Sequence, residues 1–366
     1  MSRNRLQLGA RASWTLPSPS RFGTGCSQKS GDYTSSLEMF TSGIPFAPKQ
    51  ASGKPATACA REVLLEPRTL ARLHLPAEAP HRHRAQSISD PATARVLPWR
   101  VGCNFKTYLR HHWPEYLMEA AGMGLYLLFT CLFATLLQHP HSPIRQTIQS
   151  AMVRRGLMGI AVAATVVAIV LSPWGKQSGG HINPAITFTF YRLGNVDFWD
   201  AVFYGLAQFA GAAGAVAMAA YLLRGAGDEA VRYAATIPGS YGSGVAFAAE
   251  AAISFSLMLT ILFTSNHAVL ARYTSYFVAV LYAVFILFET PLSGMSMNPA
   301  RTFGPALQAG YWHGLWIYFL APTLGMLIAG EVFLWVRGGA GPYCAKLHHA
   351  NNKRCIFRHG PLPAGS

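Results

Sequence analysis

The sequence predicts an all-α membrane protein with six transmembrane helices and two re-entrant half-helices, arranged as an inverted repeat. Hydrophobic residues make up 51% of the 366 residues and charged residues only 12%, about half the ~25% charged residues of soluble domains. The chain contains six long apolar segments, and one short motif occurs twice, at residues 183–185 and 298–300. Together these observations indicate that lipid surrounds most of the chain.

Residues 1–110 are expected to form a disordered basic extension. They are rich in Arg, Ser and Pro and contain few apolar runs, so they cannot bury enough surface to offset the entropy of ordering the chain. The Arg-rich, acid-poor start is compatible with an organelle transit peptide or with a translation start assigned too far upstream. Much of the net charge of +15 lies at the two ends of the chain, so we expect basic membrane flanks and no binding to nucleic acid.

Residues 111–338 are expected to form the membrane domain, because a spanning helix needs about 20 mainly apolar residues. Its six predicted spans are residues 116–138, 156–173, 199–223, 245–264, 273–288 and 315–336. Residues 339–366 are predicted to be a basic C-terminal tail.

Two shorter apolar segments, residues 182–191 and 297–307, follow the second and the fifth span. About ten helical residues cover ~15 Å, which is half of the ~30 Å hydrocarbon core. Such a segment must enter the membrane and turn back, and this is tolerated only against protein or a water-filled cavity.

Each short segment opens with the sequence Asn-Pro-Ala, preceded by Ser-Gly at a similar distance. The two motifs consist of Asn183, Pro184 and Ala185 and of Asn298, Pro299 and Ala300. Glu119 and Glu250 also recur, each early in the first span of its half and each followed by Ala-Ala. Since each half has three spans, the second half enters the bilayer from the opposite side. Inverted repeats place their functional site near the midplane, so we expect the two motifs to meet there.

Helix-end chemistry explains what two such motifs can do. Asn is a favoured N-cap and Pro is favoured in the first helical turn. Asn183 and Asn298 can therefore cap the half-helices through their side-chain oxygens, while their NH2 groups remain as donors that face a lumen. Each helix N-terminus adds roughly half a positive charge. This arrangement suits the oxygen of a neutral solute and opposes cations. A single motif could be an ordinary turn, but two matched copies favour a pore.

Arg301 directly follows the second motif. An ionisable residue inside an apolar segment is costly and is a functional candidate by default; the alternative is an arginine that extends to the membrane interface. An Arg together with half-helix dipoles can form an electrostatic barrier to protons and cations in a pore.

The motif regions, residues 178–187 (SGGHINPAIT) and 297–306 (MNPARTFGPA), resemble those of the aquaporin, or major intrinsic protein, family. The resemblance covers about residues 113–337 and implies an aquaporin-like fold: a right-handed six-helix pore, usually in a homotetramer, with cytoplasmic termini. It also implies that Glu119 and Glu250 hold the re-entrant loops through hydrogen bonds, and that Gln208 occupies a recurrent polar position of the third span.

The family's selectivity filter has four positions, which a count from the motifs without gaps places at Ala163, Ile286, Met295 and Arg301. Water-strict members carry an aromatic residue at the first position and His at the second. The resemblance therefore implies a wider and more apolar filter here. Glycerol-type members usually have Asp after the filter Arg, where this chain has Thr302. We therefore expect passage of water and small neutral solutes such as glycerol.

Two groups of residues outside the pore motifs have competing interpretations. His181 could gate a pore by protonation, but a structural role in its loop is favoured. Cysteine and histidine residues in the tail could bind zinc, but their spacing matches no zinc signature, so we expect neither a metal nor a cofactor. These tail residues are Cys344, His348, His349, Cys355 and His359.

A passive channel is the leading interpretation of the sequence. A secondary transporter is the alternative, because transporters also use inverted repeats and broken helices, but no proton path is evident among the ionisable residues of the spans. No nucleophile–base arrangement, phosphate-binding loop or HExxH motif supports an enzyme. The lipid bilayer is the expected partner, and a cell membrane (plasma or inner) is the expected location.

Overall fold

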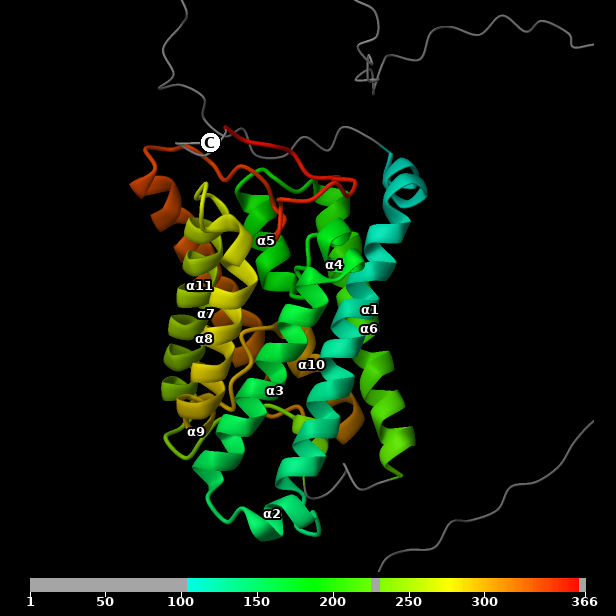
Figure 1. Cartoon of the computed structure of the whole chain (residues 1–366), viewed down its shortest axis with the longest axis vertical. Coiled ribbons are helices and arrows are strands. Elements are labelled where there is room, and N and C mark those ends of the chain that lie inside the picture. Colours follow the sequence, from blue (N-terminus) through cyan, green and yellow to red (C-terminus); the bar gives the residue numbers. More distant parts are fainter. Residues whose placement is uncertain (1–103, 225–230, 362–366) are drawn as a thin grey trace, which may run out of the picture. The chain divides into compact units, whose positions relative to one another are not determined.

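The computed structural model describes residues 104–224 and 231–361, and within them six helices are long and apolar enough to cross a membrane (Figure 1). This confirms the six predicted spans. They are α1 (Phe105–Gln138), α3 (Ala151–Leu171), α6 (Phe198–Leu223), α7 (Ser243–Ser265), α8 (Thr274–Phe288), which crosses together with the preceding turn as Ala271–Phe288, and α11 (Leu315–Val336).

The first helix begins earlier than the sequence predicts. Asn104 caps α1, since its side-chain oxygen accepts a hydrogen bond from the backbone N–H of Lys106 at 3.1 Å. The last six residues of the predicted extension, 105–110, are therefore helical. Lys106 and Arg110 are exposed, which explains why hydropathy alone placed the start of the span later. The prediction of disorder for residues 1–103 lies outside the described residues.

Two short helices correspond to the predicted half-helices, α5 (Pro184–Arg192) and α10 (Pro299–Ala309). Each begins at the proline of its motif, and each is capped by the asparagine before it. The remaining helical turns lie in the connections: α2 (Pro143–Thr147), α4 (Pro173–Ser178), η2 (Arg232–Ala234), η3 (Ala271–Tyr273) and α9 (Thr290–Ser293).

The repeat predicted from the motifs is also present in the helix packing. Helix α1 packs against α6, and α7 packs against α11. A Cβ atom placed on Gly211 of α6 would lie 2.1 Å from the carbonyl oxygen of Ala120, and one placed on Gly325 of α11 would lie 2.3 Å from that of Ala251. Both halves thus use a glycine to bring the backbones of two spans together, each at the alanine that follows a buried glutamate.

This close approach leads to a testable prediction for α6. Gly211→Ala should destabilise the protein by about 1–3 kcal/mol, because the new methyl group overlaps a backbone carbonyl. The matched control is Gly214→Ala in the same helix, where a Cβ meets nothing within 4 Å. That change should be neutral or stabilise the helix by up to about 1 kcal/mol. Thermal unfolding in detergent compares the two variants, and equal midpoints would contradict the packing argument.

The C-terminal tail is folded against the bundle as far as residue 361. In Figure 1 this red segment crosses one end of the bundle beside α4 and α5. Leu347 donates its backbone N–H to Gly179 O at 3.1 Å, Arg358 donates to Asn195 O at 2.9 Å, and the Asn195 side chain donates to Pro342 O at 2.9 Å. Composition indicated a basic tail, but it could not show that the segment packs.

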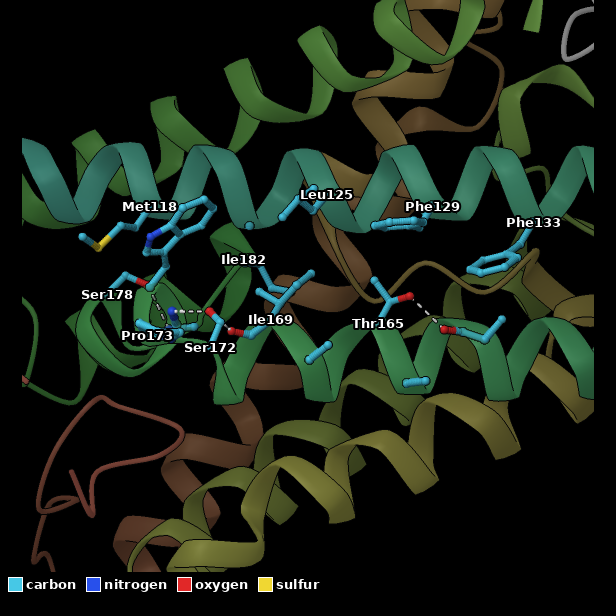
Figure 2. Close-up of a pocket in the computed structure, with 17 residues that line it drawn as sticks. Met118, Leu125, Phe129, Phe133, Thr165, Ile169, Ser172, Pro173, Ser178 and Ile182 are labelled. Atoms are coloured by element: carbon cyan, nitrogen blue, oxygen red, sulfur yellow. Dashed lines mark hydrogen bonds between the residues drawn. The ribbon is translucent and has the colours of Figure 1, made fainter. Parts of the chain in front are cut away.

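An apolar groove of about 700 Å³ lies between α1 and α3. In Figure 2, Leu125, Phe129 and Phe133 of α1 line one side, and Thr165 and Ile169 of α3 line the other. Leu125 is 37% exposed and Phe129 is 41% exposed, so the groove opens on the lateral surface of the bundle. Both motif asparagines are absent from the residues that line it. We therefore assign it to a lipid- or protein-facing surface and not to a conduction path.

Candidate functional site

The two motif asparagines tie the two halves of the chain together. Asn183 donates from its side-chain nitrogen to the carbonyl oxygen of Met297 at 2.7 Å. Asn298 donates to the carbonyl oxygen of Ile182, also at 2.7 Å. The residue before each asparagine thus supplies the acceptor for the asparagine of the other half. Both side chains are about 1% exposed.

The other end of each amide caps its own half-helix. Asn183 Oδ1 accepts from the backbone N–H of Ala185 at 2.9 Å, and Asn298 Oδ1 accepts from that of Ala300 at 3.0 Å. The capping therefore follows the sequence prediction. The crossing bonds were not predicted, and they use one N–H of each NH2 group. The Asn298 side-chain nitrogen also lies 3.7 Å from the sulfur of Met123, a weak acceptor.

Glu119 holds the loop before the first half-helix. It is fully buried in α1 and accepts three hydrogen bonds from the loop: from the Ser178 hydroxyl at 2.7 Å, from the His181 N–H at 3.1 Å and from the Ile182 N–H at 2.6 Å. The Gln208 side chain donates to the same carboxylate at 2.8 Å. One carboxylate thus provides the acceptors for a loop whose backbone has no helix or sheet partner.

Glu250 has the equivalent set of partners in the second half. It accepts from the Ser293 hydroxyl at 2.6 Å, from the Ser296 N–H at 2.7 Å and from the Met297 N–H at 2.8 Å. The side chain is fully buried in α7. The geometry agrees with the loop-holding role that the resemblance implies for both glutamates.

The glutamates also support a strained backbone. Ile182 has φ = 38° and Met297 has φ = 56°, a left-handed conformation that costs a residue with a side chain roughly 1–2 kcal/mol. The N–H groups of these two residues are the ones that Glu119 and Glu250 accept. Their carbonyl groups are the ones that the opposite asparagines reach. The buried carboxylates thus offset a local strain that directs each carbonyl toward the other half.

A cavity of about 410 Å³ leads toward the second motif. Three of the four predicted filter residues line it: Ile286 of α8, Met295 of the second loop and Arg301 of α10. The fourth, Ala163, is not among the lining residues, whereas its neighbour Val162 is.

The packing of α3 explains this shift by one residue. The α3 residues that line the cavity are Ala151, Arg155, Met158 and Val162. Their spacing of three or four residues defines one helix face. Gly159 instead packs against α8, where its Cβ would lie 2.8 Å from Ala283 O. A count along the sequence cannot determine which residues of this face line the cavity. Val162 lines it, and the filter position at Ala163, one residue further along α3, stays a prediction.

Arg301 is 7% exposed and lies in the first turn of α10. Its Nη1 donates to the carbonyl oxygen of Ala234 at 2.8 Å, which fixes the guanidinium against the connection between the two halves. Its Nε is buried without a hydrogen-bond partner among the described residues. A buried cation with an unused donor beside a cavity is suited to bind a polar solute atom.

His181 is 1% exposed, and both of its ring nitrogens have partners. Nδ1 lies 3.0 Å from the Thr187 hydroxyl, and Nε2 lies 2.7 Å from the carbonyl oxygen of Ala345. Since a carbonyl only accepts, Nε2 must carry a hydrogen. This supports the structural role expected for His181 over a gating role.

Comparisons with known proteins agree with the fold. A model of the major intrinsic protein family matches residues 107–333. Aquaporin TIP2-1 of Zea mays is 35% identical over 182 residues, which is 49% of this chain and 71% of that protein. Glycerol uptake facilitator protein-like 6 of Lactiplantibacillus plantarum is 36% identical over 174 residues, which is 47% of this chain and 78% of that protein.

A solved structure gives the same architecture. The aquaglyceroporin from Plasmodium falciparum superposes with a TM-score of 0.51 at 18% sequence identity, covering 61% of this chain and 95% of that one. At this identity the likeness concerns the fold.

Proposed function

The chain belongs to the major intrinsic protein family and is a multi-pass membrane channel for water or small neutral solutes. We propose where solutes pass through this channel and which residues form its filter. The path runs through the 410 Å³ cavity, past Arg301, to the paired Asn183 and Asn298. Its filter passes water together with small neutral solutes such as glycerol.

The observation that carries the solute proposal is the chemistry of the cavity wall. At the proposed filter, Val162, Ile286 and Met295 present aliphatic or thioether side chains, and Arg301 contributes a charged donor. Polar side chains line other parts of the cavity: Tyr126, Thr130, Gln138, Arg155 and Thr290. The apolar part of the wall favours contact with the carbon skeleton of a polyol. The name of the glycerol uptake facilitator-like relative is in line with this proposal.

Exclusion of ions is proposed to come from three positive centres along the path. Asn183 and Asn298 mark the N-termini of α5 and α10, each with roughly half a positive charge. Arg301 adds a full charge in the first turn of α10. A cation or a hopping proton would have to pass all three in a region of low dielectric constant.

The filter assignment predicts the effect of narrowing the cavity. Val162→Phe should lower glycerol permeability about tenfold or more, and water permeability by a smaller factor. The reason is that a phenyl ring in place of an isopropyl group narrows the cavity, and a narrower pore excludes the larger solute first. Stopped-flow measurements on proteoliposomes with water, glycerol and urea test this. The control is Ile160→Phe, because the Ile160 side chain in α3 is 64% exposed and does not line the cavity. It should change neither the water nor the glycerol permeability. Equal loss of water and glycerol in Val162→Phe would overturn the filter proposal.

A secondary transporter remains the alternative function, and the contacts of the buried carboxylates count against it. Glu119 and Glu250 are each occupied by three or more hydrogen-bond donors, so neither is free to carry a proton across. A solute flux that saturates and follows a proton or sodium gradient would favour the transporter. Membership of a channel family also argues against an enzyme.

A homotetramer with one pore per subunit is part of the proposal, with cytoplasmic termini and a plasma or inner membrane as its setting. The exposed apolar groove between α1 and α3 (Figure 2) is a surface that a neighbouring subunit or lipid can cover. Native mass spectrometry of the detergent-solubilised protein determines the subunit number.

A further inference from the structure

The folded tail brings two cysteines and two histidines into one cluster. Cys344 Sγ and Cys355 Sγ are 3.6 Å apart, and His359 Nε2 lies 3.3 Å from Cys355 Sγ. Ligand atoms of Cys344, His349 and His359 all lie within 4.8 Å of one another. The spacing Cys-x4-His-x5-Cys-x3-His matches no familiar zinc signature, so the sequence alone predicted no metal here. The fold supplies the proximity that the spacing did not reveal.

We propose that Cys344, His349, Cys355 and His359 form a tetrahedral site for a structural Zn²⁺ ion. Two thiolates and two imidazoles are a ligand set that zinc commonly takes in structural sites. The two thiolates balance the charge of the ion. Four protein ligands complete the coordination and leave no position for a reacting water, so the ion holds the tail in place and takes no part in chemistry.

Cys344, His349 and His359 form a compact group of three ligands, and Cys355 lies close to two of them, Cys344 and His359. With Zn–S bonds of about 2.3 Å and Zn–N bonds of about 2.0–2.1 Å, a tetrahedral ion places two sulfurs about 3.8 Å apart and a sulfur and a nitrogen about 3.6 Å apart. The observed separations are 3.6 Å for Cys344–Cys355 and 3.3 Å for Cys355–His359. Both lie within about 0.3 Å of a coordinated cluster. The ring nitrogens of His349 and His359 and the sulfur of Cys344 lie within 4.8 Å of one another, so these three ligands can share one centre.

A disulfide is the competing explanation for two adjacent sulfurs. The separation of 3.6 Å is far from a bonded S–S distance of about 2.05 Å, and both cysteines are free. A disulfide would also give no role to the two histidines. The ligand set as a whole therefore favours the metal.

Contacts around the cluster hold the ligands in position. The Lys346 ammonium, on a residue that is 2% exposed, donates to the carbonyl oxygens of Lys353 at 3.2 Å and Arg354 at 2.7 Å. These two hydrogen bonds close the turn between the pair Cys344 and His349 and the pair Cys355 and His359. The ring of Tyr343 packs edge-on against His349, with centroids 4.8 Å apart, and stacks on His359 at 5.1 Å. This packing restricts the rotation of both imidazole rings.

The cluster lies beside segments that contact the first pore loop. Ala345 accepts the hydrogen bond from His181 Nε2 at 2.7 Å. The Phe357 ring stacks on the His181 ring, with centroids 5.3 Å apart and an angle of 14° between the planes. Leu347 donates to Gly179. Zinc would thus hold residues 344–349 and 355–359 of the tail together. Both segments contact the loop that leads to Asn183.

The direct test is the metal content of the full-length protein, purified in detergent with its affinity tag removed and without chelators. Elemental analysis should find about one zinc per chain. The double variant Cys344→Ser/Cys355→Ser should lose at least about 90% of it, and His349→Ala should lose most of it. The matched control is His348→Ala, which removes the adjacent histidine and should retain the wild-type content. Cobalt-loaded wild-type protein should show the visible absorption of a tetrahedral thiolate site, which the double variant lacks.

A second readout follows the tail itself. A zinc chelator should speed proteolytic cleavage within residues 338–361 by about tenfold in the wild type, since metal binding stabilises the folded segment. It should have no effect on the double variant, which should already be cleaved rapidly. Wild-type protein without zinc after incubation with zinc salt would overturn the proposal. So would zinc retained by the double variant, or intact-mass evidence of a Cys344–Cys355 disulfide in the freshly isolated protein.

Discussion

Replacing Arg301 by alanine should raise the permeability to protons and small cations at least about tenfold while leaving water flow within about twofold. The guanidinium lies at the cavity wall, is 7% exposed and is fixed by Ala234. Removing one charge from a site of low dielectric constant lowers a barrier of several kcal/mol, and each 1.4 kcal/mol corresponds to a factor of about ten. Passage of glycerol relative to water should also rise, because the side chain occupies part of the filter.

Proteoliposomes with a pH-sensitive dye inside and a potassium diffusion potential across the membrane measure this proton leak, and stopped-flow swelling measures solute flow. Arg272→Ala is the matched control, because Arg272 is exposed in η3 and stacks on Tyr273 outside the cavity. It should behave as the wild type. Unchanged proton leak and unchanged solute ratios in Arg301→Ala would remove Arg301 from the filter.

The second large effect is expected for Glu250→Ala. The change leaves the N–H groups of Ser296 and Met297 and the hydroxyl of Ser293 without an acceptor in a fully buried site. Each unsatisfied buried group costs about 1–3 kcal/mol, and the strained backbone at Met297 loses its support. We expect a destabilisation of at least about 3 kcal/mol, with loss of monodisperse protein in detergent.

Glu331→Ala is the control for this experiment. Glu331 forms a 2.9 Å ion pair with Arg192, but both side chains are about half exposed, and such pairs contribute about 0–1 kcal/mol. The melting temperature of the Glu331→Ala variant should stay within a few degrees of the wild-type value. If Glu250→Ala melted at the same temperature as Glu331→Ala, the second loop would not depend on the carboxylate.

The sequence predicted the membrane fold because two of its signals are local. A run of apolar residues determines whether a segment can span the bilayer, and Asn-Pro at the start of a short apolar segment determines where a half-helix begins. The observed helices α5 and α10 start at Pro184 and Pro299, directly at the motifs. Glu119 and Glu250 were recognised from their recurrence and the family resemblance, and the structure gives them matched partners.

The features that the sequence did not predict depend on contacts between distant segments. Whether Val162 or Ala163 lines the cavity depends on a rotation of α3 that is set by Gly159 against α8. The tail that carries the cluster is held by hydrogen bonds from its backbone to Gly179 and Asn195, which are distant in sequence. Spacing within the tail carries no information about such long-range partners.

Asn183 and Asn298 join the two halves by donating to main-chain carbonyl groups, those of Met297 and Ile182. These hydrogen bonds do not depend directly on the side chains at positions 182 and 297, where the chain has isoleucine and methionine. A duplicated unit that joins its copies through peptide groups can accumulate substitutions at the meeting point without losing symmetry there. This offers a physical account of how two halves with few side chains in common keep one shared centre.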